Sequence, residues 1–322
     1  MANSLIQRQR ETVNLRFGMF LHFNSATFQF ASGDTVDWEY DCENNGVPRQ
    51  HPFSPADWNP QELDCAQWAR IAKEAGAAFG VLTAKHHEGF CLWPTRYTEH
   101  CVRNAACKTD VVGAYVQAFR EQWLLPGLYF SILDLTQGIG RKRCTPEDKE
   151  YIKGQITELL TGYGEIPFLL VDGWGAPWGG PSYEALPFEE VDSWVKALQP
   201  DCLLINIGSG CSLDHTDMVL YENNAGQQAE DSFVGPGMGC DILTGAWFWR
   251  KDDPARELRT SQWAAGRIAE MNRQNITFIL NASPNQKGRI DANVEKVFQG
   301  IAPLRKPVPP LAALPEGWLY RG

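Results

Sequence analysis

Short apolar runs alternate with longer stretches of helical spacing along most of the chain. The short runs predict eight strands, at residues 16–23, 79–84, 127–133, 167–172, 202–207, 217–222, 245–249 and 275–282. The longer stretches predict helices at residues 65–76, 110–123, 145–164, 188–200 and 257–274. Eight strands in strand–helix alternation predict an α/β fold, a (β/α)8 barrel of the TIM type rather than a doubly wound sheet.

One domain accounts for nearly the whole chain. The chain has 322 residues, which fits one large α/β domain, and no internal repeat or linker divides it. We assign residues 1–302 to the barrel. Residues 303–322 form a Pro-rich tail that is too short for a second domain, and we expect it to pack on the barrel surface.

Charge and cysteine content narrow the classes of partner and compartment. The formal net charge of -10 argues against nucleic acid and anionic membranes, since both attract a basic surface. The nine cysteines are scattered without a Cys-x-x-Cys pair, which favours reduced thiols over a disulfide framework or a metal site. The polar N-terminus has no signal-peptide core, and no apolar run approaches the ~20 residues of a membrane helix. We therefore expect a cytoplasmic protein.

Polar and aromatic residues gather where the predicted strands end, which is where barrels of this type carry their chemistry. The pair Trp247 and Trp249 would share one face of the strand predicted at 245–249. The polar residues at strand ends are His22, Lys85, His86, His87, Glu88, Asp134, Asp172, Asn206, Glu222 and Asn281. Convergent polar groups beside aromatic rings predict a ligand site at this rim.

The adjacent histidines His86 and His87 suit a ligand rich in hydroxyl groups, because an imidazole both donates and accepts hydrogen bonds. Lys85 stands beside them as a further candidate. The alternative is a hydrolase metal centre in which His22 and Asp172 join the pair. No His-x-His or His-x-x-x-His spacing favours metal.

Two carboxylates at strand ends predict a glycosidase. Asp172 and Glu222 can divide the work of an ionised nucleophile and a protonated general acid. The alternatives are a turn-forming Asp-Gly for Asp172 and a solvated charge for Glu222, with Glu230 or Asp231 as the acid instead. Either tryptophan, Trp247 or Trp249, could be an apolar platform for a sugar or plain core. Asp110 is predicted to cap a helix.

The chain resembles the α-L-fucosidases of glycoside hydrolase family 29. The resemblance covers about residues 15 to 300, and its most specific part is "LTAKHHEGFCLWPT". The residues of this motif look closest to those of the family branch that cuts α-1,3 and α-1,4 fucosyl links. The other matching segments are "RFGMFLHF", "KTDVVGAYVQAFR", "GLYFS", "LLTGYGEIPFLLVDGW", "WVKALQP" and "NITFILNASPNQKGRID".

The resemblance implies a retaining mechanism without metal or organic cofactor. It implies that Asp172 is the nucleophile and that Tyr129 lines the pocket. It also implies sugar-binding roles for the early-loop Glu39 and for the three histidines His22, His86 and His87. The chain departs from the family at the acid/base, because Asn224 occupies the position where that branch often has Glu, and Glu222 lies two residues earlier. Either the loop is shifted so that Glu222 serves as the acid/base, or the acid/base has been lost.

The β-sandwich domain that usually follows the barrel in this family is absent from the chain, so a second subunit could complete the rim. We expect an exo-acting retaining α-L-fucosidase acting on fucosylated glycans. Three alternatives stay open: a glycosidase for another fucose-like sugar such as L-galactose, a catalytically silent sugar-binding protein, and a metal-dependent hydrolase.

Overall fold

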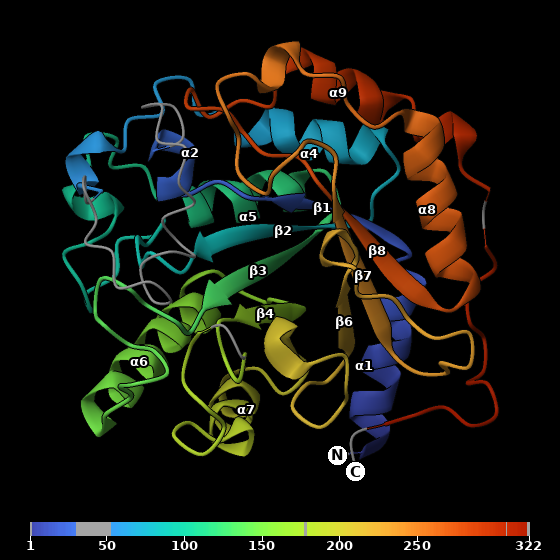
Figure 1. Cartoon of the computed structure of the whole chain (residues 1–322), viewed down its shortest axis with the longest axis horizontal. Coiled ribbons are helices and arrows are strands. Elements are labelled where there is room, and N and C mark those ends of the chain that lie inside the picture. The colour runs from blue at the N-terminus through green and yellow to red at the C-terminus, as the bar shows by residue number, and fades with distance from the viewer. Residues whose placement is uncertain (1, 30–52, 177–178, 307, 321–322) are drawn as a thin grey trace.

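Eight parallel strands form a nearly closed barrel in the computed structural model (Figure 1). The structure describes residues 2–29, 53–176, 179–306 and 308–320. The strands are β1 Phe17–Leu21, β2 Phe79–Lys85, β3 Leu125–Ser131, β4 Phe168–Asp172, β5 Leu203–Asn206, β6 Val219–Glu222, β7 Gly237–Ile242 and β8 Ile276–Asn281. Their order in the sheet is β5-β4-β3-β2-β1-β8-β7-β6. The predicted barrel is confirmed, and the described residues contain no β-sandwich.

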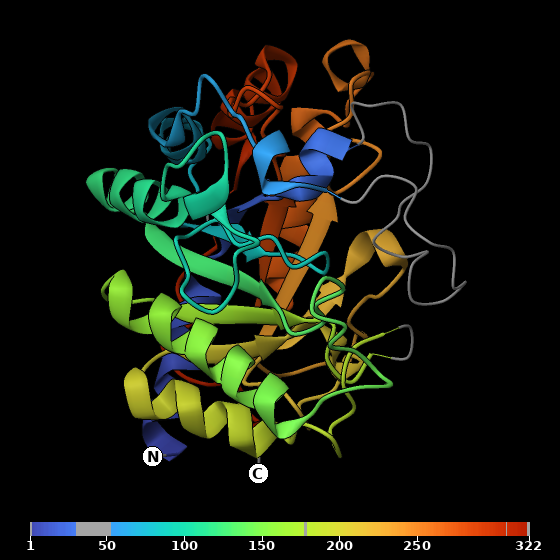
Figure 2. The ribbon, with the colours of Figure 1, turned by 90° about the vertical axis from the view of Figure 1, so that its left-hand side faces the viewer.

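Helices cover the outside of the strands. Figure 1 shows α4, α5, α6, α7 and α8 around the barrel, and Figure 2 shows α6 and α7 lying along its outer face. The helices are α1 Ala2–Asn14, α2 Ser25–Gln29, α4 Cys65–Glu74, α5 Val111–Glu121, α6 Pro146–Gly162, α7 Phe188–Leu198, α8 Ser261–Arg273 and α9 Ala292–Gln299. The five predicted helices are confirmed as α4 to α8, whereas α1, α2 and α9 were not predicted. No helix in the described ranges is long and apolar enough to cross a membrane.

Capping residues begin the helices where the sequence indicates. Asp110 accepts a hydrogen bond from the amide of Gly113, which confirms it as the N-cap of α5. Thr145 and Asp148 form a reciprocal capping box at the start of α6. These caps fix where the helices that follow β2 and β3 begin.

The seventh strand is not where the apolar run predicted it. Residues 243–248 are a series of bends, and β7 is the glycine-rich segment Gly237–Ile242. The prediction failed because Gly237 and Gly239 weaken the strand pattern. Both lie close against neighbouring side chains: a Cβ on Gly237 would lie 2.8 Å from Ile276, and one on Gly239 would lie 3.1 Å from Asn223 Oδ1 and 3.2 Å from the sulfur of Met271.

The barrel interior is filled by side chains from all eight strands. Val13 of α1 and Trp318 of the C-terminal tail belong to the same cluster. They close the barrel at the amino-terminal ends of the strands. The strand residues of this interior are Phe20, Phe79, Val81, Tyr129, Phe168, Leu170, Leu203, Ile205, Leu220, Met238, Cys240 and Ile279, and Met218 joins them from just before β6. The tail also bonds α1, where the Leu311 amide donates to Asn14 Oδ1 at 2.7 Å.

Side chains join β5 to β6, the one neighbouring pair without a ladder among the described strands. The amide of Leu204 donates to the Asp217 carboxylate at 2.8 Å, and the amide of Asn206 donates to Thr216 Oγ1 at 2.9 Å. Lys196 Nζ pairs with Asp217 at 2.7 Å. On this side of the barrel, β5 and β6 are each followed by a single 3-10 turn instead of a helix.

Candidate active site

A pocket of about 240 Å³ opens at the carboxyl ends of the strands. Its lining combines the two candidate carboxylates with imidazole, phenol, indole and aliphatic groups from seven of the eight strands or the segments that follow them. The lining residues are Phe20, His22, His86, Tyr129, Asp172, Ile207, Glu222, Ala225, Cys240 and Trp247. Of the polar residues predicted at the strand ends, His22, His86, Asp172 and Glu222 therefore meet at one cavity.

Asp172 is the last residue of β4, and hydrogen bonds fix both of its oxygens. Tyr129 of the neighbouring strand β3 donates its hydroxyl to Oδ2 at 2.7 Å, and the amide of Gly173 donates to Oδ1 at 2.7 Å. His87 Nε2 lies 3.7 Å from Oδ2. The side chain is 13% exposed, so the carboxylate is held in place yet open to the pocket.

Glu222 ends β6 and faces the same cavity. Trp247 Nε1 donates to its Oε1 at 3.1 Å. Burial raises the pKa of Glu222 above its ordinary value, and the nearby charge of Asp172 raises it further, although the bond from Trp247 opposes both effects. Glu222 therefore keeps a proton to higher pH than an exposed glutamate.

His22, at the end of β1, is enclosed by aromatic rings. Trp247 stacks on it at 4.6 Å between ring centroids, and Phe20 packs at 4.3 Å. Its Nδ1 lies 2.9 Å from Oδ1 of Asn281, the last residue of β8. Burial and the neighbouring His86 hold the pKa of His22 well below its ordinary value, so the ring is neutral.

The adjacent histidines divide between the pocket and its wall. His86 lines the cavity and stacks on Tyr129 at 5.2 Å, with the rings 8° from parallel. His87 is buried, and its Nδ1 lies 2.7 Å from Ser131 Oγ. His86 is thus placed to meet a ligand, and His87 adjoins Asp172.

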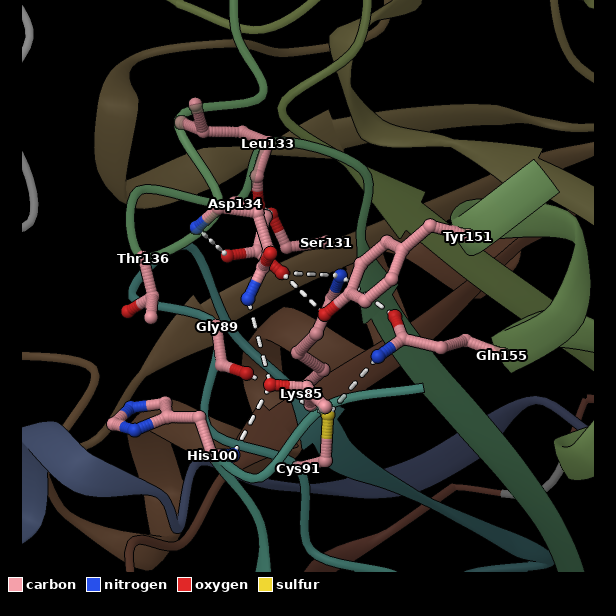
Figure 3. Close-up of polar contacts among 12 residues, drawn as sticks. Lys85, Gly89, Cys91, His100, Ser131, Leu133, Asp134, Thr136, Tyr151 and Gln155 are labelled. Carbon is pink, nitrogen blue, oxygen red and sulfur yellow. Dashed lines mark hydrogen bonds and ion pairs between the residues drawn. The ribbon is translucent and has the colours of Figure 1, made fainter. Parts of the chain in front are cut away.

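Lys85 does not reach the pocket, which corrects the expectation that it binds a ligand. It is fully buried, and its Nζ lies 3.1 Å from Asp134 and 3.0 Å from Gln155 (Figure 3). Tyr151 donates to the same carboxylate at 3.1 Å. The backbone of Gly89 has a φ of +104°, and a Cβ there would lie 2.3 Å from Asp134 Oδ1. The lysine therefore anchors the segment that carries the two histidines to α6.

The two tryptophans do not share a face. Trp247 lines the pocket, whereas Trp249 points its Nε1 at Asp291, 2.7 Å away, and is absent from the lining. The prediction failed because it treated residues 245–249 as a strand. Phe248, which lies between them, packs against His86 at 4.9 Å. Glu39 lies outside the described residues.

Several lining residues were missed by the sequence analysis. Ile207 and Ala225 lie in the turns after β5 and β6, and Cys240 lies in the unpredicted strand β7. Phe20 could have been found from its position two residues before His22, because alternate strand residues share a face. The turn residues carried no comparable pattern.

The rival acids lie elsewhere. Glu230 and Asp231 are exposed, and neither lines the cavity that contains Asp172. Asp231 borders a second cavity formed with α8. Within the described ranges, no three His, Cys, Asp or Glu side chains are arranged to hold a metal ion.

Comparison with known proteins agrees with this geometry. The family model described as Alpha-L-fucosidase matches residues 2–304. This chain belongs to the alpha-L-fucosidase family. The family membership expected from the sequence motifs is confirmed.

The relatives differ in length from this chain. Alpha-L-fucosidase 1 of Arabidopsis thaliana is 30% identical over 318 residues, which cover 90% of this chain and 58% of the relative. The chain thus spans somewhat over half of that curated relative. A putative alpha-L-fucosidase from Bacteroides thetaiotaomicron superposes with a TM-score of 0.75 at 26% identity, covering 91% of this chain and 66% of that structure.

A second structure from Bacteroides thetaiotaomicron shares the fold. It is an alpha-L-fucosidase trapped as a covalent intermediate with 2-fluoro-fucosyl fluoride. Its TM-score is 0.74 at 22% identity, and the match covers 91% of this chain and 72% of that structure.

Proposed function

We propose that this chain is an exo-acting retaining α-L-fucosidase that removes terminal fucose from glycans. The observation that carries the proposal is the pair Asp172 and Glu222, which end β4 and β6 and line one pocket in a chain of this family. A retaining glycosidase requires two such carboxyl groups, one ionised and one protonated. The related structure trapped as a covalent intermediate supports the retaining course.

In the first step, an oxygen of Asp172 attacks the anomeric carbon while the glycosidic C–O bond breaks. Glu222 gives its proton to the departing oxygen, and a glycosyl ester of Asp172 results. In the second step, Glu222 takes a proton from water as the water attacks the same carbon, and the ester bond breaks. Fucose leaves, and both carboxyl groups return to their first state.

The remaining groups of the pocket would hold the sugar. His22 and His86 face the cavity with ring nitrogens suited to hydroxyl groups. Trp247 and Phe20 offer apolar faces for the side of fucose that carries its methyl group. Bonds that strengthen as the ring flattens would lower the barrier.

The test is release of nitrophenol from 4-nitrophenyl α-L-fucoside by the purified protein, with and without EDTA. We expect turnover in both conditions, and we expect Asp172→Ala to reduce it by roughly 10⁴-fold or more. Asp214→Ala, which changes an exposed acid in the loop between β5 and β6, is the matched control and should keep full activity.

Each contrary result has a separate meaning. Turnover of an L-galactoside but not the fucoside would show that the substrate sugar is L-galactose rather than fucose. Loss of turnover with EDTA would favour a metal-dependent hydrolase. Binding of fucose without turnover of any aryl glycoside would favour a sugar-binding protein. Unchanged turnover in Asp172→Ala would end the proposal.

A further inference from the structure

The side-chain amide of Asn281 is held in a single orientation. Its Nδ2 lies 2.7 Å from the carbonyl oxygen of Trp247 and 2.9 Å from Ser283 Oγ. A carbonyl oxygen only accepts, and the Ser283 hydroxyl donates its own proton to that same carbonyl, so it accepts from the amide. Both hydrogens of Nδ2 are thereby used, and Oδ1 must face the other way.

That orientation decides which nitrogen of His22 carries a proton. Asn281 Oδ1 lies 2.9 Å from His22 Nδ1, and an amide oxygen only accepts. Nδ1 therefore holds the proton. Because burial and the adjacent His86 keep the pKa of His22 well below its ordinary value, the ring is neutral and Nε2 is unprotonated.

Nε2 is the atom of His22 that remains for a ligand. His22 lines the pocket, and Nε2 makes no hydrogen bond to any residue that the structure describes. Trp247 and Phe20 pack on the ring at 4.6 and 4.3 Å, so the ring cannot turn freely to exchange its two nitrogens.

We infer that Asn281 is a positioning residue that fixes His22 as the Nδ1–H tautomer, so that Nε2 accepts a hydrogen bond from a hydroxyl of the ligand. The tautomer follows from the contacts alone, whereas the identification of that hydroxyl as one on fucose rests on the proposed function. Such a site discriminates against groups that only accept, because two lone pairs would face each other. Fluorine in place of the hydroxyl should then bind no better than hydrogen.

His87 provides an internal reference for a test. Its Nδ1 lies 2.7 Å from Ser131 Oγ, and that hydroxyl donates to the carbonyl of Leu133 at 2.7 Å. The hydroxyl proton is already used, so Nδ1 of His87 must also be protonated. This relay shares no residue with the one through Asn281.

The direct test is a ring-nitrogen NMR spectrum of protein labelled with ¹⁵N-histidine. The chain has six histidines, and His22→Gln assigns the signal of His22. We expect His22 in the wild type to show protonated Nδ1 and unprotonated Nε2. Asn281→Ala should convert it, wholly or in part, to the Nε2–H tautomer while Nδ1 of His87 stays protonated. An Nε2–H tautomer or a doubly protonated ring in the wild type would overturn the inference, as would an unchanged signal in Asn281→Ala.

Asn272→Ala is the matched control for lost packing. Asn272 is equally buried, and its amide donates to the carbonyls of Arg16 and Ile276 at the opposite end of β8. We expect this variant to lose stability and leave the signal of His22 unchanged. A changed signal there would mean that the tautomer responds to general loosening, which would contradict the role of Asn281.

Ligand binding tests the acceptor role. L-Fucose and its analogues with hydrogen or fluorine in place of each ring hydroxyl are titrated calorimetrically into the wild type. At one position we expect both analogues to bind about 10-fold more weakly than fucose, because each lacks the donor. In Asn281→Ala, fluorine at that position should regain affinity relative to hydrogen. If fluorine rivals the hydroxyl at every position, the inference fails. If fucose does not bind at all, the proposed function fails while the NMR spectrum still decides the tautomer.

Discussion

The half of the barrel that carries Asp172 is built more regularly than the half that carries Glu222. Helices α4 to α7, of 10 to 17 residues, follow β1 to β4, whereas single 3-10 turns follow β5 and β6. Side chains join β5 to β6 where a backbone ladder would otherwise run. The proposed nucleophile therefore lies on a strand that is followed by a helix. The proposed acid lies on β6, which is followed only by a 3-10 turn, and this turn borders the pocket.

The difference suggests a division of tasks. Asp172 has both oxygens fixed by bonds from β3 and from its own turn, which suits a group that must attack along one direction. Glu222 is held by a tryptophan in the segment after β7, so its setting depends on loops that can vary with the leaving group.

After Asp172→Ala, the largest effect is expected at Glu222. Replacing it with alanine should lower kcat/KM for a fucosylated oligosaccharide by about 10²–10⁴-fold, because a sugar leaving group needs a proton. The loss should be much smaller for the 4-nitrophenyl fucoside, whose leaving group is already acidic. Parallel assays of both substrates measure the contrast, with Glu230→Ala as the control that should lose neither activity. Equal losses on both substrates would remove Glu222 from the role of acid.

The next effect concerns stability on the Asp172 side. Asp134→Asn leaves the buried ammonium of Lys85 without its charge partner and should cost about 3–5 kcal/mol of unfolding free energy. Urea unfolding measures the loss. The double variant Lys85→Met, Asp134→Leu should recover most of it, since a buried apolar pair needs no compensation. A single variant as stable as wild type would show that the pair does not anchor β2 to the segment after β3.

Tyr129→Phe should reduce kcat by about 10–100-fold, because a hydrogen bond to a charged group contributes about 1.5–3 kcal/mol. The ring keeps its stacking on His86, so binding of fucose should change little. A comparison of kcat with the affinity for fucose separates the two. A loss confined to affinity would make Tyr129 part of sugar binding rather than a support for Asp172.

The smallest effect is a shift of pH dependence on the Glu222 side. The bond from Trp247 stabilises the ionised form of Glu222, so Trp247→Phe should raise the pKa of Glu222 further. The alkaline limb of kcat/KM should then move upward by about one pH unit or less, since such a bond is worth about 1 kcal/mol. A downward shift would show that Trp247 does not hold the carboxylate form.

The same two halves explain how far the sequence could predict the molecule. The strand that ends at Asp172 is strongly apolar, so its position and its end residue were predicted correctly. The apolar run at 16–23 likewise contains β1, which ends at Leu21, one residue before His22. The strand β7 was missed because Gly237 and Gly239 serve packing rather than strand propensity.

The contacts between side chains within the site could not be predicted from the sequence. Lys85 adjoins His86 in the chain, but Lys85 is the last residue of β2 and turns to Asp134, whereas His86 follows the strand and lines the pocket. The separation of Trp247 from Trp249 likewise follows from a loop whose path no periodicity encodes. The contact between Asn281 and His22 joins residues 259 positions apart, and only closure of the barrel between β8 and β1 brings them together.

Azide tests most directly whether Asp172 attacks the anomeric carbon and Glu222 transfers the proton. In Glu222→Ala, azide should replace water in the second displacement and give α-L-fucosyl azide, with the configuration of the substrate. In Asp172→Ala, azide should attack the substrate itself in a single displacement and give the β anomer. NMR of the two products distinguishes them. Opposite anomers in this order are the predicted result, and the same anomer from both variants, or the reverse order, would contradict the assignment.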